Sequence, residues 1–325
     1  MFPNERMRRQ RRRKIIPLLQ ENWIRKEDLI YPLFVDENLE KCEPIKSMPG
    51  QFSYSVHEIA GKAEELALIG LKAVILFGIP KNKDNTGSSA YNEDGVIQKS
   101  IRLIKEKLPE MVIITDVCAC EYTENGHCGI TAGCHDSIDL DNDLSLPLME
   151  KIALSHAKAG ADIVAPSSML DGVVMSIRKS LDLAGFQEVL ILSYSSKFAS
   201  ALYGPFRDAA KSGFSFGDRT TYQMNPANAR EALMESELDF KEGADILMVK
   251  PASFYLDILS SVKKIGIPVA AYQVSGEYSM IKAASMNGWI NERAIVMESL
   301  ISIKRAGADL ILTYFAEEVL RWLDE

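Results

Sequence analysis

The chain has 325 residues, of which 47% are hydrophobic and 25% charged, and its formal net charge is −8. This balance is typical of a globular protein with a large core, and the acidic excess argues against nucleic acid as the main partner. No apolar run reaches the roughly 18 residues that a membrane-spanning helix needs. The first residues do not form a secretory signal, so we expect a cytoplasmic protein, not bound to a membrane, with reduced cysteines.

A dense basic segment, MRRQRRRK at residues 7–14, stands near the N-terminus and is followed by the apolar IIPLL and Trp23. These apolar side chains need burial, and a closed domain downstream offers them no obvious place. We therefore expect residues 1–28 to form an extended arm that packs on a neighbouring subunit. An arm that binds nucleic acid or a membrane surface is the alternative.

Eight apolar runs recur along residues 29–325, and their branched side chains are typical of strands that are buried on both faces. Three of them follow Gly-Ala-Asp, in AKAGADIVAPSS, KEGADILMVKPA and KRAGADLILTYFA, where the glycine suits the left-handed cap that ends a helix. Amphipathic segments such as HEIAGKAEELALIG lie between most of them. The runs are 29–35, 72–78, 111–117, 161–167, 189–195, 244–250, 267–273 and 308–315.

These repeated βα units predict an α/β protein with one catalytic (β/α)8 barrel, a TIM barrel, over residues 29–325. A doubly wound open sheet is the alternative, because a count of strands does not prove closure. No glycine-rich phosphate loop follows the first strand, which disfavours a dinucleotide site.

Reactive side chains stand at or near the C-terminal ends of the runs, and these ends converge on one mouth in a barrel. They are Asp116, Cys118, Ser167, Lys197, Lys250, Tyr272, Ser275 and Tyr314. A lysine that is crowded by apolar side chains and by a second ammonium has a lowered pKa, and its neutral amine can form a Schiff base with a ketone. We expect this role for Lys197 and Lys250; the alternative is that each lysine extends its ammonium group to solvent or pairs with a carboxylate.

A long segment follows Lys197, FASALYGPFRDAAKSGFSFGDRTTYQMNP, and it is rich in glycine, serine and aromatic residues. This composition is typical of a loop that closes over an active site. Arg207 and Arg219 lie on it and could hold a substrate carboxylate in a bidentate fork. The other interpretation is a solvated surface loop.

Three of the five cysteines lie in DVCACEYTENGHCG, residues 116–129. Cys118, Cys120 and Cys128 follow the pattern C-x-C-x7-C, which differs from the paired knuckles of a structural zinc site. Three thiolates leave the fourth position of a zinc ion open, as catalytic zinc requires. A disulfide or simple burial of the cysteines is less favoured. His127, Cys134 and His135 are additional candidate ligands.

Together these motifs resemble the porphobilinogen synthase (5-aminolevulinate dehydratase) family over nearly the whole chain. The motifs are IYPLFV, SMPG, DVCACEYTENGHCG, SYSSKFASALYGPFRDA, YQMNP, LMVKPA, AYQVSGEY and GADLILTYFA. The resemblance implies a lyase of tetrapyrrole (haem) biosynthesis, which condenses two molecules of 5-aminolevulinate into the pyrrole porphobilinogen with loss of two waters. It also implies a homo-octamer with exchanged arms.

The resemblance implies a role for each matching residue. Lys250 would hold the first substrate as a Schiff base, at the P side, and Lys197 would hold the second, at the A side, beside the zinc. Arg207, Arg219 and Gln223 would bind the A-side carboxylate, Ser275 and Tyr314 the other. Asp116, Ser167 and Tyr272 would line the site, and Asp116 and Ser167 would serve proton transfer and orientation.

The resemblance also assigns an allosteric magnesium to Glu235 at a subunit boundary; a glutamate in a surface salt bridge is the alternative. Thr221 stands where some animal relatives have a cysteine, and this difference disfavours an additional zinc site. Glu124 and Asn125 replace the usual Ser-His of the cysteine loop.

Two other functions are consistent with the same residues. A class I aldolase would use a single lysine, and the thiolates would then have no part in the chemistry. A zinc-binding regulatory protein would use the basic arm on nucleic acid, and the acidic net charge disfavours it.

Overall fold

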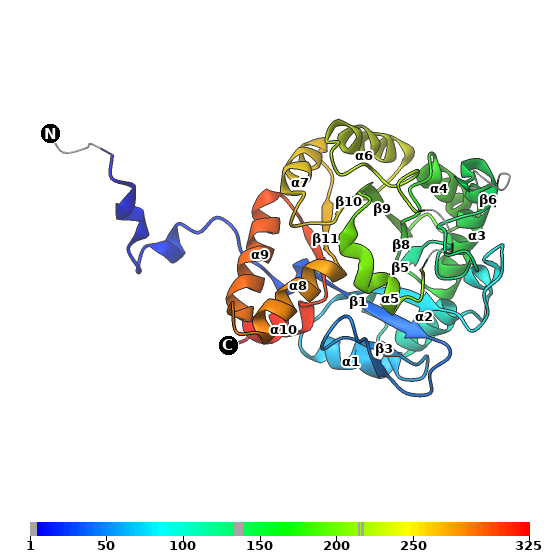
Figure 1. The fold of residues 1–325 in the computed structure, drawn as a ribbon, viewed down its shortest axis with the longest axis horizontal. Helices are drawn as coiled ribbons and strands as arrows, with labels where there is room; N and C mark the ends of the chain where they lie inside the picture. The colour runs from blue at the N-terminus through cyan, green and yellow to red at the C-terminus, as the bar shows by residue number, and fades with distance from the viewer. Residues whose placement is uncertain (1–4, 133–138, 214, 216–217) are drawn as a thin grey trace.

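The computed structural model describes residues 5–132, 139–213, 215 and 218–325 (Figure 1). Cys134 and His135, two candidate ligands, lie outside the described residues.

Eight parallel strands form a closed barrel, because the last strand pairs with the first: Leu29 lies opposite Ile311 and Ile30 opposite Leu312. The predicted TIM barrel is therefore confirmed, and the open sheet is wrong. The strands are β1 (Leu29–Asp36), β4 (Ala73–Ile79), β5 (Val112–Val117), β8 (Ile163–Pro166), β9 (Leu190–Lys197), β10 (Ile246–Lys250), β11 (Val269–Gln273) and β12 (Leu310–Thr313).

Helices surround the barrel and cover the outer faces of its strands (Figure 1). They are α1 (Ile59–Leu68), α2 (Val96–Lys107), α3 (Asn142–Ala159), α4 (Val173–Leu183), α6 (Arg230–Glu242), α7 (Leu256–Val262), α9 (Glu292–Ala306) and α10 (Ala316–Leu323). Two more helices, α5 (Gly204–Ala209) and α8 (Ser275–Met286), pack against each other and follow the C-terminal ends of β9 and β11. Short strands β2 (Glu43–Pro44) and β3 (Phe52–Tyr54) extend the sheet beside β1, and β6 (Thr131–Ala132) pairs with β7 (Asp139–Leu140).

The repeated Gly-Ala-Asp has two structural roles. Its glycine ends a helix: Gly160 after α3 and Gly243 after α6 both have φ of 108°, a backbone conformation that L side chains rarely adopt. Its aspartate then binds the beginning of the preceding strand in the barrel. The carboxylates of Asp162, Asp245 and Asp309 accept hydrogen bonds of 2.7, 2.8 and 2.8 Å from the backbone N–H groups of Ile113, Ile191 and Val269.

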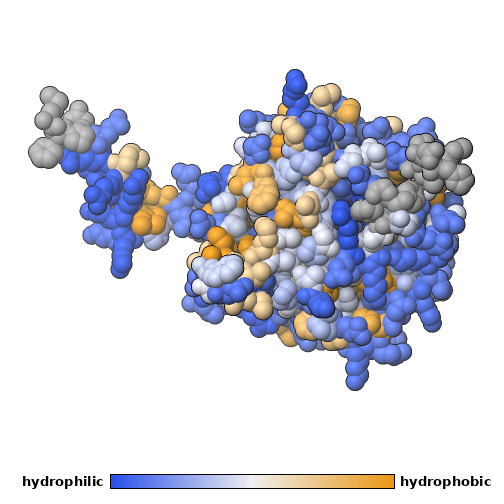
Figure 2. Space-filling model, viewed as in Figure 1, coloured by the Kyte–Doolittle hydropathy of each residue, from blue (hydrophilic) through white to orange (hydrophobic). Residues whose placement is uncertain are grey.

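The arm that precedes β1 extends away from the barrel (Figure 1). It holds three short 3-10 helices, η1 (Met7–Arg11), η2 (Ile16–Leu18) and η3 (Lys26–Asp28). Its apolar side chains Met7, Ile16, Leu18, Leu19 and Trp23 are exposed, Ile15 is half-buried, and the first buried one is Ile24. Figure 2 shows hydrophobic and hydrophilic residues side by side on this arm. Among the described residues, no helix has both the length and the apolar character that a membrane span requires.

Candidate active site

The two candidate lysines end neighbouring strands at the same level. Lys197 is the last residue of β9, Lys250 is the last residue of β10, and the two are paired in the register of the sheet. Both side chains are buried. The closed barrel therefore brings together the two groups that the sequence places 53 residues apart.

Aromatic rings surround the ammonium group of Lys250. Its Nζ lies 4.3 Å from the ring centre of Tyr272, 4.9 Å from that of Tyr194, and 5.2 Å from those of Tyr203 and Phe206. Burial, and second the charge of Lys197, lower the pKa of Lys250 to about 7. A large fraction of this amine is therefore neutral near neutral pH, as a nucleophile that attacks a ketone requires.

Lys197 faces the same cavity from the neighbouring strand. Its ammonium group donates a short hydrogen bond to the backbone carbonyl of Ser167, directly after β8, and lies 5.6 Å from the ring centre of Tyr194. Asp116, near the end of β5, faces both lysines. Burial raises the pKa of Asp116, while the charges of Lys197 and Lys250 and a hydrogen bond from Ser167 oppose that increase.

The three cysteines form a compact cluster on the loop that follows β5. The sulfurs of Cys118, Cys120 and Cys128 all lie within 4.8 Å of one another, and the first two are 3.4 Å apart. All three side chains are buried and none forms a disulfide. Hydrogen bonds from Cys118 and Cys120 lower the pKa of Cys128 well below its ordinary value. His127 lies outside this cluster and pairs instead with the hydroxyl of Tyr222 at 3.1 Å.

The segment after β9 covers the lysines and supplies two cations. Arg207 belongs to α5, is half-buried, and shares a cavity with Lys197 and Lys250. Arg219 lines the same cavity and donates hydrogen bonds of 2.8 and 3.1 Å to the carbonyls of Gly126 and Ser212. Burial, and second the charge of Arg219, lower the pKa of Arg207. Two neighbouring guanidinium groups in a buried cavity are suited to an anionic ligand.

Tyr272 and Tyr314 form a second part of the site, at the ends of β11 and β12. Their hydroxyls are 3.0 Å apart, and both side chains are buried. Ser275 begins α8 and accepts a hydrogen bond of 2.9 Å from the backbone N–H of Phe206. This contact ties α8 to α5, so the covering segment and the barrel mouth are joined through Ser275.

The cavity lies between the strand ends and α5. Its lining residues are Phe77, Asp116, Cys120, Glu121, Ser167, Lys197, Tyr203, Phe206, Arg207, Arg219 and Lys250. The sequence prediction did not include Phe77, Glu121, Tyr203 or Phe206. Burial, and second the charge of Asp116, raise the pKa of Glu121 to about 7. The position of Glu121 beside a candidate metal ligand was the only signal in the sequence that could have identified it.

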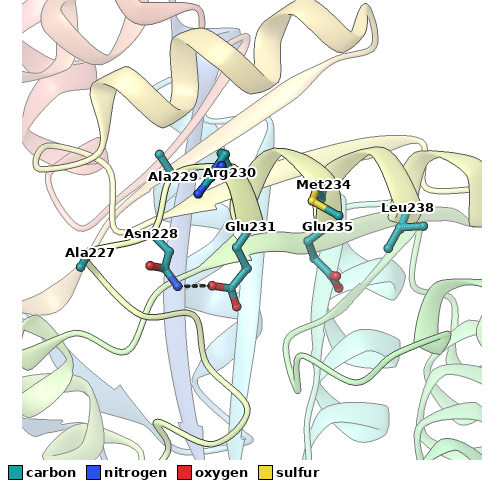
Figure 3. Close-up of a pocket in the computed structure, with 8 residues that line it drawn as sticks. All are labelled: Ala227, Asn228, Ala229, Arg230, Glu231, Met234, Glu235 and Leu238. Carbon is teal, nitrogen blue, oxygen red and sulfur yellow. Dashed lines mark hydrogen bonds between the residues drawn. The ribbon is translucent and has the colours of Figure 1, made fainter.

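Two of the candidate residues lie elsewhere. Gln223 is buried but lines a different hollow, which it shares with Thr221, Asn228 and Glu235. Glu235 projects from α6 on the same side as Glu231, one turn earlier, and Asn228 donates a hydrogen bond of 2.8 Å to Glu231 (Figure 3). Burial, and second the charge of Asp239, raise the pKa of Glu235 to about 7. Glu235 therefore lies in an acidic hollow apart from the lysine cavity.

Comparison with known proteins places this arrangement in a family. Residues 4–322 match the model of the family described as delta-aminolevulinic acid dehydratase. A relative with that name from Archaeoglobus fulgidus is 56% identical over 319 residues, which cover 98% of each chain. One from Staphylococcus aureus (strain Mu50) is 52% identical over 309 residues, which cover 95% of each chain.

A solved structure shows the same fold. The delta-aminolevulinic acid dehydratase (porphobilinogen synthase) of Toxoplasma gondii, in complex with the reaction product porphobilinogen, is 43% identical. It superposes with a TM-score of 0.95 and covers 98% of this chain and 92% of its own. The paired lysines, the thiol cluster and the closed barrel are thus those of a chain that belongs to the delta-aminolevulinic acid dehydratase family.

Proposed function

We propose that Lys197 and Lys250 each hold one substrate molecule in the reaction of this family, the condensation of two molecules of 5-aminolevulinate into porphobilinogen. The observation that carries the proposal is the pairing of the two lysines across β9 and β10 in one buried cavity. A class I aldolase needs a single such lysine, whereas a reaction that joins two ketones has a use for both.

The chemistry of two Schiff bases accounts for both waters. The amine of Lys250 attacks the ketone carbon of one substrate, and one water leaves as the imine forms. Lys197 does the same with the second substrate, and a second water leaves. A carbon–carbon bond then forms at one imine carbon and a carbon–nitrogen bond at the other. Each new bond turns an imine into an amine, and the lysine then leaves as an adjacent carbon or nitrogen loses a proton, so both amines are regenerated and the pyrrole ring closes.

Proton transfers in this sequence need a group that faces both lysines, and Asp116 has that position. Its raised pKa is suited to a group that both accepts and returns protons. The backbone carbonyl of Ser167 holds the ammonium group of Lys197, and the hydroxyl of Ser167 contacts Asp116. We therefore assign proton transfer and the orientation of the reacting groups to Asp116 and Ser167, while the two lysines form the covalent bonds with the substrates.

The residues of the cysteine cluster fit a zinc ion. Thiolates that bind zinc at about 2.3 Å in a tetrahedron lie roughly 3.8 Å apart, and soft sulfur ligands favour zinc over magnesium. The three sulfurs, all within 4.8 Å of one another, need little movement to adopt that geometry. When bound there by Cys118, Cys120 and Cys128, zinc would act as a Lewis acid toward a substrate group beside Lys197.

The substrate carboxylates have two candidate positions. Arg207 and Arg219 lie together at one wall of the cavity and would bind the carboxylate of the substrate on Lys197. Ser275 and Tyr314, with Tyr272, would bind the carboxylate of the other substrate near Lys250. Gln223 would join the first group only after movement of the covering segment, because it does not line the cavity in this structure.

Magnesium and oligomerisation complete the proposal. Glu235 lies in an acidic hollow beside Glu231, and oxygen ligands of this kind suit magnesium, so this hollow is our candidate for the site of an allosteric ion.

The exposed apolar arm would pack on a neighbouring barrel, in an octamer of this chain. The four free cysteines among the described residues suit a reducing compartment, and we propose the cytoplasm.

The proposed function is tested by incubating the purified chain with 5-aminolevulinate, with and without added zinc. We expect a pyrrole, identified as porphobilinogen by mass, and we expect zinc to increase its rate of formation. Replacing Lys197 with alanine separates this function from that of an aldolase. The variant should make no pyrrole and still form a reducible imine at Lys250, whereas a single-lysine enzyme would be unaffected.

A further inference from the structure

Glu121 has a buried carboxylate oxygen for which the mechanism above gives no use. The side chain is 2% exposed and follows Cys120 on the loop after β5. One oxygen, Oε2, accepts a hydrogen bond of 3.2 Å from the thiol of Cys120. The other, Oε1, is buried and has no hydrogen-bond partner. A buried acceptor without a partner is unfavourable, and because Glu121 lines the cavity, this oxygen indicates a group that arrives with a ligand.

The charges of the cavity show which kind of group would satisfy this oxygen. Arg207 and Arg219 offer donors, which suit a carboxylate. The two acidic side chains among the described residues of the lining are Asp116 and Glu121. Asp116 already contacts Ser167 and faces both lysines. The free oxygen of Glu121 is therefore the acceptor left for a cation.

The substrate of the proposed function carries such a cation. In 5-aminolevulinate an ammonium group and a carboxylate lie at the two ends of a short chain, with the ketone near the ammonium end. We propose that Glu121 binds the ammonium group of one substrate molecule through Oε1, and thereby selects amino ketones over plain keto acids. This inference rests on the proposed function and adds a specificity-determining residue to it.

The geometry supports this assignment. The ligand atoms of Glu121, Asp116 and Cys118 lie within 4.8 Å of one another, so Glu121 stands at the junction of the thiol cluster and the proton-transfer group. An ammonium group held there would lie beside the candidate zinc while the neighbouring ketone faces the lysines that line the same cavity. Glu121 would thus set the orientation of the bound substrate, with its ammonium end toward the thiol cluster.

The test compares two ligands that differ only in the ammonium group. One is 5-aminolevulinate, and the other is 4-oxopentanoate, the same molecule without its amino group. In Glu121→Gln we expect the concentration for half-maximal imine trapping with borohydride, and the Michaelis constant, to rise about 10- to 100-fold for 5-aminolevulinate. The inhibition constant and the half-trapping concentration of 4-oxopentanoate should change less than about twofold.

Glu124→Gln is the matched control, because Glu124 lies on the same loop and is exposed. It should leave both ligands unaffected. Zinc content is measured in each variant, since Glu121 also contacts Cys120. Equal weakening of both ligands in Glu121→Gln, with or without loss of zinc, would show a structural role and overturn the inference, as would no change in either. A wild-type chain that forms no pyrrole would instead refute the proposed function.

Discussion

Lys197 and Lys250 are register partners on adjacent parallel strands, and one ring, that of Tyr194, lies close to both ammonium groups, at 5.6 and 4.9 Å. Neighbouring strands are about 4.8 Å apart, so two substrates bound to these lysines would have their ketone carbons close together. A barrel that pairs the lysines in this way positions the two molecules for bond formation before any chemistry takes place.

Lys250 should form an imine with 5-aminolevulinate that borohydride traps in a pH-dependent way. Its pKa of about 7 means that lowering the pH protonates the amine and raising it frees the amine. The neutral fraction should rise from about one tenth at pH 6 to about nine tenths at pH 8. Peptide mass mapping after reduction should locate the main adduct on Lys250, with the exposed Lys241 as an unlabelled control. An adduct confined to surface lysines would refute this role.

The cysteine cluster should bind one zinc ion that turnover needs. Replacing Cys118, Cys120 and Cys128 with serine removes the soft ligands that favour zinc. We expect zinc content to fall from about one ion per chain to a background level, and pyrrole formation to fall with it. Cys42→Ser, at an exposed cysteine, should retain both. Full activity in the triple variant would falsify a catalytic metal.

Arg207 should act in substrate binding rather than in the bond-forming steps. A charge-assisted hydrogen bond contributes about 1.5–3 kcal/mol, so Arg207→Ala should raise the Michaelis constant about 10- to 150-fold. Imine formation at Lys250 should still occur at saturating substrate. Arg305→Ala, on the exposed side of α9, is the control. Wild-type saturation behaviour in Arg207→Ala would exclude the carboxylate clamp.

Glu235 should determine any response of the enzyme to magnesium. Glu235→Gln keeps the shape of the side chain but removes the charge that a magnesium ion requires. If the hollow beside α6 holds the ion, stimulation of pyrrole formation by magnesium should disappear while activity without magnesium remains. Glu237→Gln, exposed on the same helix, should respond as the wild type does. An unaltered magnesium response in Glu235→Gln would show that the ion binds elsewhere or not at all.

Removal of residues 1–20 should reduce the size of the assembly. The exposed Ile16, Leu18 and Leu19 would each contribute about 1.5–3 kcal/mol when fully buried on a neighbouring barrel. Light scattering should therefore report a smaller mass for the truncated chain, together with lower activity. A full-length chain with glutamine at Arg8, Arg9, Arg11, Arg12 and Arg13 tests how the charge of the arm affects the assembly, separately from the burial of its apolar side chains. An unchanged large oligomer after truncation would contradict the role of the arm.

The barrel could be predicted from the sequence because the patterns that specify its strands are local. Branched apolar runs and the Gly-Ala-Asp repeat specify the strands, and closure places residues from the C-terminal strand ends at one mouth. Glu121 and Tyr194 could not be found in this way, because their roles depend on which face of a loop or strand points inward. Gln223 shows the converse: its motif predicts a substrate contact, but the path of the covering segment puts it in another hollow.

The three aspartates of the Gly-Ala-Asp repeats have a consequence for how this enzyme can change. Asp162, Asp245 and Asp309 fasten the N-terminal ends of β5, β9 and β11, whereas Lys197 and Lys250 stand at the opposite ends of their strands. A substitution at one end of the barrel therefore need not be felt at the other. We expect substitutions at these aspartates to lower heat resistance and to leave substrate choice, which is set at the lysine ends, unchanged.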